Sequence, residues 1–211
     1  MPIFSYFMAQ IYDKIMQKAE SRCLHDWRSQ LLKQVSGTVL EIGAGTGVNL
    51  DYYPDSANPI YLLEPDAAMQ AKLQHKISTN NNARVKILSS NAESIPLPSA
   101  SCDFVVSTLV LCSVNNPEAV LAEIHRVLKP DGKFIFIEHV AAQNNPERLK
   151  WQKRLEPLWK IIACNCHLTR NTEQDIIQAG FKLINIERGQ SMRGVPGVVR
   201  PSIKGVAVMQ R

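Results

Sequence analysis

The chain of 211 residues is long enough for one globular domain with a sizeable core, and its 45% apolar and 20% charged residues are ordinary for a folded protein. It has no run of about 18 apolar residues and no basic start followed by an apolar core, so we expect no transmembrane helix, no signal peptide and a cytoplasmic location. The net charge of +5 is uneven: residues 148–211 carry 12 Lys and Arg against 4 Asp and Glu, and this segment faces either an anionic partner or solvent.

Residues 1–36 predict one or two amphipathic helices, because apolar residues recur there at helical spacing. Apolar strands then alternate with helices, which is typical of βαβ units and a parallel sheet. The expected strands lie in the runs 38–47, 59–66, 84–91, 102–114 and 133–140. Helices are expected at 66–78 and at 116–132, the second stopping at the Pro-Asp-Gly of 130–132.

The pattern loosens after residue 146. The run 146–168 predicts a helix broken at Pro157, and a short helix follows near 172–181, for which Thr169 is a suitable N-cap. Two final strands are expected at 182–189 and 203–210. We therefore divide the chain into an N-terminal helical cap, 1–36, and one domain, 37–211, in which 146–170 is an insertion.

The stretch from Glu41 to Gly47, "EIGAGTG", lies at a strand-to-helix junction, where glycine permits a tight turn and close approach to a ligand. Glu64 ends the next strand, where a carboxylate can accept both hydroxyls of a ribose. Val48 stands where the dinucleotide fingerprint requires its third glycine. The pattern therefore indicates a ligand with a ribose but no pyrophosphate, and the upstream acid suits a cationic sulfonium amino acid.

Four motifs in this order resemble class I S-adenosylmethionine (SAM) methyltransferases, with the core of the ubiquinone-biosynthesis-like, type 11 subfamily. They are "VLEIGAGTG", "LLEPD", "NAESIPLPSASCDFVVS" and "EIHRVLKPDGKFIFIEH", and they cover roughly residues 38–140. The resemblance implies an α/β, Rossmann-like fold. Its seven-stranded sheet is mostly parallel with an antiparallel last strand, and it has helices on both faces and an N-terminal helical cap.

The resemblance also implies SAM as cofactor and S-adenosylhomocysteine as product. Glu41 would hold the methionine amino group, and Glu64 the ribose 2′- and 3′-hydroxyls. Thr108 and Leu109 would touch the methionine tail and the acceptor side. Asn91 stands where the family often has Asp, and its amide oxygen can still accept from the adenine amino group. The other residues implied to line the cofactor are Gly43, Ala44, Gly45, Gly47, Pro65, Ala92 and Glu93.

Three further stretches resemble the methyltransferase-like 7 family of alkyl thiol methyltransferases: "TLVLCSV" (108–114), "EHVAA" (138–142) and "WQKRLEPLWKIIACNCHLTR" (151–170). The last lies outside the common SAM core, so class I ancestry alone does not explain it. This resemblance implies a small, partly apolar acceptor such as a thiol, in a pocket shaped by the 146–170 segment. The candidate pocket residues are Cys112, Trp151 and Cys166. That family carries an N-terminal hydrophobic anchor, whereas this chain has an amphipathic helix, so we expect at most weak peripheral membrane contact.

Two histidines are candidate catalytic residues, because a thiol acceptor must be deprotonated before it attacks. His139 ends the fifth strand, on the side of the sheet where ligands of such folds bind, and His167 lies in the 151–170 run. A structural role weighs about equally for His139. Proximity alone suffices for an acceptor thiol of low pKa.

The stretch "ACNCHLTR" (163–170) brings two thiols and an imidazole together in sequence. We expect no metal there, because C-x-C-H lacks a second ligand pair, and the nearest other cysteine, Cys112, belongs to a separate element. Five scattered cysteines in a reducing compartment favour free thiols. Cys166 matches the thiol-methyltransferase run and is the pocket candidate, while Cys164 does not match.

Two alternatives stay open. One is a quinone or phospholipid-headgroup methyltransferase, suggested by the subfamily core. The other is a non-catalytic SAM-binding module, because a cofactor site does not prove turnover. No nucleic-acid partner is expected, since Ser-Thr-Leu-Val at 107–110 stands where an N-P-P-Y-type motif would lie. The acceptor's identity and the oligomeric state are not fixed by the sequence.

Overall fold

The computed structural model describes residues 2–79, 82–189 and 192–210, without the side chains of residues 2–5 and 8. The strands are β1 (Gly37–Ile42), β2 (Ala57–Leu63), β3 (Val85–Leu88), β4 (Cys102–Thr108), β5 (Leu128–His139), β6 (Phe181–Gly189) and β7 (Ser202–Met209). The α-helices are α1 (Pro2–Ala19), α2 (His25–Leu32), α3 (Ala67–Thr79), α4 (Pro117–Val127), α5 (Pro146–Ile162) and α6 (Thr172–Gln178). Shorter turns are the π-helical η1 (Glu20–Leu24) and the 3₁₀ turns η2 (Val48–Tyr52) and η3 (Gly197–Val199).

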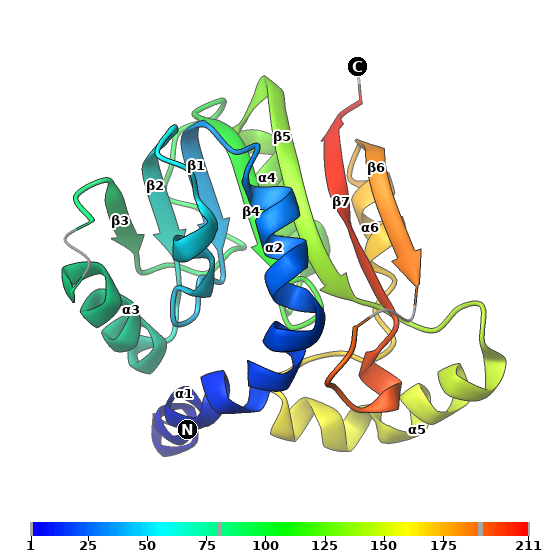
Figure 1. Ribbon diagram of the computed structural model, residues 1–211. Helices are drawn as coiled ribbons and strands as arrows, with labels where there is room; N and C mark the ends of the chain where they lie inside the picture. The colour runs from blue at the N-terminus through cyan, green and yellow to red at the C-terminus, as the bar shows by residue number, and fades with distance from the viewer. Residues whose placement is uncertain (1, 80–81, 190–191, 211) are drawn as a thin grey trace.

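The strands form one seven-stranded sheet in the order β3-β2-β1-β4-β5-β7-β6 (Figure 1). Strands β1 to β5 pair in parallel, and β7 pairs antiparallel with both β5 and β6. The predicted fold class is confirmed. Ile42 is level with Leu63 on one side and Ser107 on the other, so the carboxyl ends of β1, β2 and β4 meet at one edge. Ligands of open α/β sheets bind at this edge.

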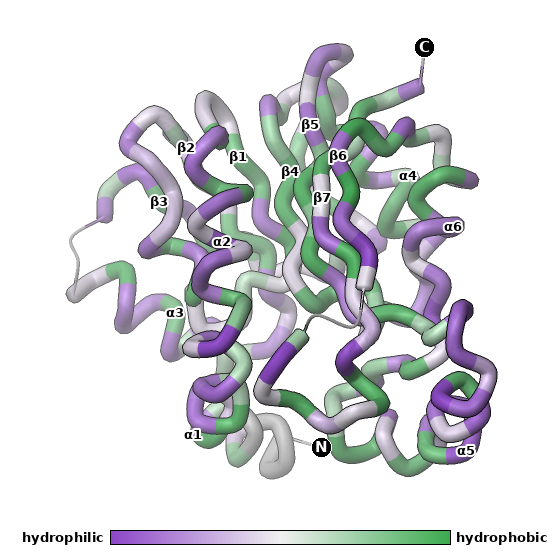
Figure 2. Tube along the Cα trace, turned by 45° about the vertical axis from the view of Figure 1, so that its right-hand side comes forward, coloured by the Kyte–Doolittle hydropathy of each residue, from purple (hydrophilic) through white to green (hydrophobic). Residues whose placement is uncertain are grey.

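Helices cover both faces of the sheet. The buried face of α4 packs with α6 and one side of β4 and β5, and α2, η2 and α3 pack on the opposite side (Figure 1). Covering both faces requires strands with continuous apolar runs, as in "FVV" of β4 and "FIFI" of β5. Figure 2 shows these apolar segments gathered in the central strands, with polar segments along the outer helices.

Helices α1 and α5 lie beyond the carboxyl edge, at the bottom of Figure 1. The α1–α2 segment is fixed to the body by a small apolar cluster that includes Leu24, Trp27, Ile137 and Met192. This cluster joins the first helices to β5 and to the loop before β7. In the part of the chain that the structure describes, none of the helices is both long and apolar enough to cross a bilayer.

Two predicted elements end earlier than the sequence suggested. β4 stops at Thr108, because Leu109 has φ +61° and leaves the extended conformation. α4 stops at Val127, and Leu128 is already extended. Pro130 contributes to this end, since it disfavours the helical conformation at Lys129, the residue before it. The start of α4 follows the prediction, with Pro117 at the first turn and the Asn116 side chain accepting from Ala119 N at 3.0 Å.

Two expectations for the 146–181 segment were wrong. α5 runs unbroken through Pro157, which is exposed, so the carbonyl oxygen left without a donor can bond to water. Thr169 is not an N-cap: α6 begins at Thr172 after Asn171. The backbone N–H and hydroxyl of Thr169 instead donate to Glu156 Oε2, at 2.7 and 2.6 Å, and thereby tie the loop to α5.

Candidate active site

The glycine loop after β1 has the geometry that its sequence predicts. Gly43, Gly45 and Gly47 have φ values of +60°, +55° and +82°, a region that other residues rarely adopt. A Cβ at Gly43 would lie 2.5 Å from a methyl group of Val110, so this glycine permits close packing of the loop after β4. A Cβ at Gly45 would meet nothing within 4 Å. The backbone at Gly45 is therefore open to a ligand.

Glu64 lies beside this loop at the end of β2, and 6% of its surface is exposed. Its Oε2 accepts from Gly45 N at 2.8 Å, and its Oε1 accepts from Asp66 N at 2.9 Å. Burial raises the pKa of this carboxyl, while the two backbone donors oppose the rise. Each oxygen retains a lone pair, so the carboxylate can accept two further hydrogen bonds, as the vicinal hydroxyls of a ribose require.

Glu41 is the penultimate residue of β1 and is buried with 2% exposure. Its Oε1 accepts from Asn49 Nδ2 at 2.9 Å and its Oε2 from the Tyr53 hydroxyl at 2.8 Å. Burial raises the pKa of Glu41 to about 7, against the lowering effect of these two donors. A buried carboxylate of this kind is stabilised by a cationic ligand, and the amino group of a methionine moiety is one.

Arg28 is a buried residue of the site that sequence reasoning missed. Its guanidinium donates to Asn49 Oδ1 at 2.6 Å and to Thr108 Oγ1 at 3.0 Å, and it pairs with Glu20 at 2.9 Å. Thr108, which was predicted to lie near the methionine tail, is thus linked through Arg28 to Asn49, in the turn after the glycine loop. The sequence does contain an indication of this role. Arg28 lies on the same apolar side of the helix as Leu24, Leu31 and Leu32, so its charge is placed among residues that are expected to be buried.

The α1 helix covers the glycine loop. The Thr46 hydroxyl donates to Asp13 Oδ1 at 2.8 Å. Tyr12 lines a small cavity of about 40 Å³ together with Glu41 and Gly43, and burial raises its pKa to about 12. A wide hollow of about 1080 Å³ continues between α1 and α3, where Pro65 and Thr46 belong to its lining.

The predicted adenine residues follow β3. Ala92 is buried, Asn91 is exposed and Glu93 is partly buried. Glu93 Oε1 accepts from Asn116 N at 3.4 Å, which links this loop to the start of α4. The structure places these three residues at the same edge of the sheet as Glu64, next to β2.

Glu138 organises the loop after β4 and was not predicted as a site residue, although it lies in the quoted "EHVAA". It is fully buried, and its Oε1 accepts from Ser107 Oγ at 2.7 Å and from the backbone N–H groups of Val110 and Leu111 at 3.1 Å. Its Oε2 accepts from Cys112 N at 3.4 Å. Burial raises the pKa of this carboxyl. Glu138 therefore fixes the position of Cys112.

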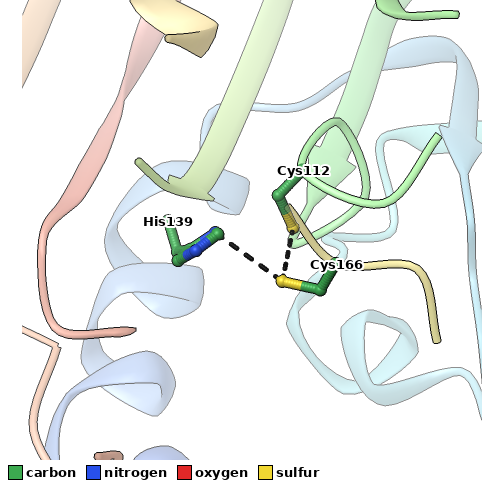
Figure 3. A group of neighbouring side chains, drawn as sticks. All are labelled: Cys112, His139 and Cys166. Atoms are coloured by element: carbon green, nitrogen blue, oxygen red, sulfur yellow. Dashed lines mark hydrogen bonds between the residues drawn. The ribbon is translucent and has the colours of Figure 1, made fainter. Parts of the chain in front are cut away.

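Three residues predicted separately meet at the end of β4 and β5 (Figure 3). Cys166 Sγ lies 3.7 Å from Cys112 Sγ and 3.8 Å from His139 Nδ1. The candidate ligand atoms of all three side chains lie within 4.8 Å of one another. Cys112 and His139 are buried, and Cys166 is partly exposed. The expectation that Cys112 lies apart from the 163–170 stretch was wrong, because the fold brings the two separate elements into contact.

The surroundings shift the two thiols in opposite directions. The contact with Cys112 lowers the pKa of Cys166 despite burial, and His139 and the Trp159 indole lower it further. The same contact, together with burial, raises the pKa of Cys112. Cys166 is therefore the thiol that ionises first, and it carries the nucleophilic or ligating capacity of the pair.

Two other predicted residues lie away from this cluster. The ring of His167 faces Glu156, with Nδ1 and Oε1 3.8 Å apart, and burial lowers its pKa. Trp151 is 54% exposed on the outer side of α5, where Arg154 lies over its ring, so it does not form a wall of a buried pocket.

The sheet order, the glycine loop and the two acids at the carboxyl ends of β1 and β2 define a class I SAM-dependent methyltransferase, with SAM as its cofactor. The comparisons agree. A family model of the methyltransferase domain matches residues 40–136. Geranyl diphosphate C-methyltransferase from Streptomyces coelicolor A3(2), solved with S-adenosyl-L-homocysteine, has the same fold with a TM-score of 0.69 at 13% identity, covering 87% of this chain and 77% of that one.

The chain is 37% identical to thiol S-methyltransferase TMT1B of Rattus norvegicus, over 97% of this chain and 85% of that protein. It is 31% identical to thiol S-methyltransferase TMT1A of Homo sapiens over the same shares. The chain therefore belongs to the TMT1 thiol S-methyltransferase family. The family resemblance of the sequence motifs is confirmed.

Proposed function

We propose that this protein transfers the methyl group of SAM to the sulfur of a small, partly apolar thiol. The observation that carries the proposal is the identity of 37% with thiol S-methyltransferase TMT1B across nearly the whole chain. Such coverage includes the segments outside the common SAM core, and those segments supply Cys166 to the carboxyl edge of the sheet.

The proposed cofactor contacts follow from the geometry. Glu41 holds the amino group of the methionine moiety, and Glu64 accepts from the ribose hydroxyls. The glycine loop approaches the methionine and ribose with its backbone, and Thr108 and Leu109 border the methyl end. Bound SAM supplies a methyl group on a sulfonium sulfur, which is already a good leaving group. Asn91, Ala92 and Glu93 border the adenine.

The proposed acceptor end is the cluster of Cys112, His139 and Cys166. It adjoins the cofactor site through Tyr12, which lines the small cavity with Glu41 and whose pKa is raised in part by the nearby Cys112. Of the two histidines predicted as catalytic, His139 lies at this end. The protein's own tasks are to align the acceptor sulfur with the methyl group and to exclude water.

An acceptor panel tests the proposal. The purified chain is incubated with methyl-labelled SAM and alkyl thiols, quinols or phospholipid headgroups, and the labelled products are identified by mass spectrometry. We expect label in the thioether and a strongly reduced rate for Glu64→Gln at limiting SAM, since this variant loses a charge-assisted acceptor. Transfer only to quinols or lipids would show that the acceptor class is wrong. Binding of SAM without transfer to any acceptor would favour the non-catalytic alternative.

A further inference from the structure

The Cys112–His139–Cys166 cluster has the dimensions of a metal site. A tetrahedral Zn²⁺ with Zn–S bonds of about 2.3 Å and Zn–N bonds of about 2.0 Å separates two sulfur ligands by about 3.8 Å, and sulfur from nitrogen by about 3.5 Å. The two sulfurs here are 3.7 Å apart, and Cys166 Sγ lies 3.8 Å from His139 Nδ1. The ligand atoms of Cys112 and His139 lie within 4.8 Å of each other, so this third pair must close by up to about 1.3 Å for an ion of this size to bind all three side chains.

The backbone holds the two thiols at this distance. The loop after α5 is joined to the loop after β4 by His167 N donating to Cys112 O at 2.8 Å and by Asn165 Nδ2 donating to Ser113 O at 2.8 Å. Arg170 adds a bond from its guanidinium to Val114 O at 2.9 Å. These bonds flank Cys166 on both sides. A preformed ligand set of this kind binds a metal without the cost of assembling it.

The imidazole of His139 is a second, independent indication. It is 1% exposed, and its Nε2 is buried without a hydrogen-bond partner among the described residues. Among the residues that the structure describes, the hydrogen-bonding partner of its Nδ1 is the Cys166 sulfur, at 3.8 Å. A zinc ion would bind Nδ1, which has only a long contact to sulfur among the described residues, and would leave Nε2 as an N–H; the support that His139 gives is therefore the weakly partnered Nδ1 that faces the two thiols.

We propose that Cys112, His139 and Cys166 bind one thiophilic divalent cation of the Zn²⁺ type, and that its open fourth position takes the acceptor sulfur. Two thiolates and one imidazole are ligands that suit zinc, and three protein ligands with one open position are typical of catalytic zinc sites. The binding of the ion stands independently, whereas its role toward the acceptor rests on the proposed function.

The ion would supply the acceptor as a thiolate. On coordination, the acceptor thiol loses its proton to solvent. The acceptor sulfur then forms a bond to the methyl carbon while the carbon–sulfur bond of the sulfonium breaks, and the electron pair of that bond stays on the departing sulfur. The products are a methyl thioether and S-adenosylhomocysteine. A thioether is a weaker ligand than a thiolate, so the methylated product leaves the metal.

Metal titration of the full chain tests the binding. Chelator-treated protein is titrated with ZnCl₂ against a chromophoric chelator, and bound zinc is counted by elemental mass spectrometry. We expect one zinc per chain in the wild type and in Cys164→Ser, the neighbouring exposed thiol. Cys112→Ser and Cys166→Ser should bind at least about 100-fold more weakly, since even loss of an outer-shell partner costs 10–100-fold. Equal affinity of Cys166→Ser and the wild type would overturn the site.

Alkylation of the wild type gives a reading that does not depend on how a variant folds. We expect zinc to protect Cys166 from iodoacetamide and to leave Cys164 as reactive as before; equal labelling of Cys166 with and without zinc would overturn the site. Thiol methylation at an unchanged rate after zinc removal would overturn the metal's role and leave the proposed function standing. A chain that binds zinc but methylates none of the thiols would refute the proposed function and the metal's role, and leave the binding site in place.

Discussion

Glu41 shows how one residue couples stability to pH. Its pKa is raised by burial from the ordinary value of 4.5 to about 7. Between these values the folded protein holds a proton that the unfolded chain has released. The free energy of unfolding therefore falls as pH rises from about 4.5 to about 7, and it levels off above that window. A cationic ligand offsets this cost by favouring the carboxylate.

The Glu41→Gln variant isolates this contribution. A glutamine can still accept from Asn49 and can donate to the Tyr53 hydroxyl, so the packing is kept while the titration is lost. We expect the free energy of unfolding of the variant, relative to the wild type, to increase steadily between pH 5 and 7 in urea titrations. Glu118→Gln, on the exposed side of α4, should keep the pH dependence of the wild type. A pH-independent difference for Glu41→Gln would show that Glu41 titrates in its ordinary range.

At the scale of elements, Glu138 of β5 accepts four hydrogen bonds from the end of β4 and the loop that follows it. In Glu138→Gln, the amide oxygen can still accept from Ser107 and from the backbone N–H groups of Val110 and Leu111. The amide N–H₂ faces Cys112 N, which loses its acceptor, and the negative charge is lost. We expect a loss of about 1–3 kcal/mol in the free energy of unfolding by urea titration, because a buried donor is left unpaired.

The matched variant is Ser107→Ala, which removes one donor and should cost about 0.5–1.5 kcal/mol. Hydrogen exchange of the Val110 to Cys112 amides should accelerate in Glu138→Gln more than in Ser107→Ala. The same stability for both variants would show that the carboxylate does not hold the loop.

The strands and the candidate cofactor residues could be predicted from the sequence, whereas the long-range contacts of the site could not. The strands β1, β4 and β5 are continuous apolar runs because both faces of the sheet are covered, and this local pattern located them. Glu41 and Glu64 could be singled out because each lies at the carboxyl end of such a strand. The Cys112–Cys166 contact was not predictable from spacing, since 54 residues and two helices separate the thiols. The buried roles of Arg28 and Glu138 depend on long-range partners, which a local pattern does not contain.

At the scale of the whole molecule, the N-terminal helices and the loop before β7 pack together beside the candidate cofactor site. The loop before β7 packs on the N-terminal helices: Arg193 N donates to Cys23 Sγ at 3.3 Å, and Met192 is buried in the cluster with Trp27. α1 in turn covers the glycine loop through Asp13 and Thr46. The loop before β7 therefore packs against the same N-terminal helices that cover the glycine loop.

Gly194 is the closest point of this contact, and its substitution tests the link. It has φ +86°, and a Cβ there would collide with the carbonyl oxygen of Lys18 and lie 2.7 Å from Ala19 N, both of which are backbone atoms. We expect Gly194→Ala to lower the free energy of unfolding by about 1–2 kcal/mol, from the left-handed conformation alone, and to weaken SAM binding measured by calorimetry as α1 shifts. Gly197→Ala is the matched control, because a Cβ at Gly197 meets nothing within 4 Å. If the two variants bind SAM equally well, the C-terminal loop does not position α1 over the cofactor.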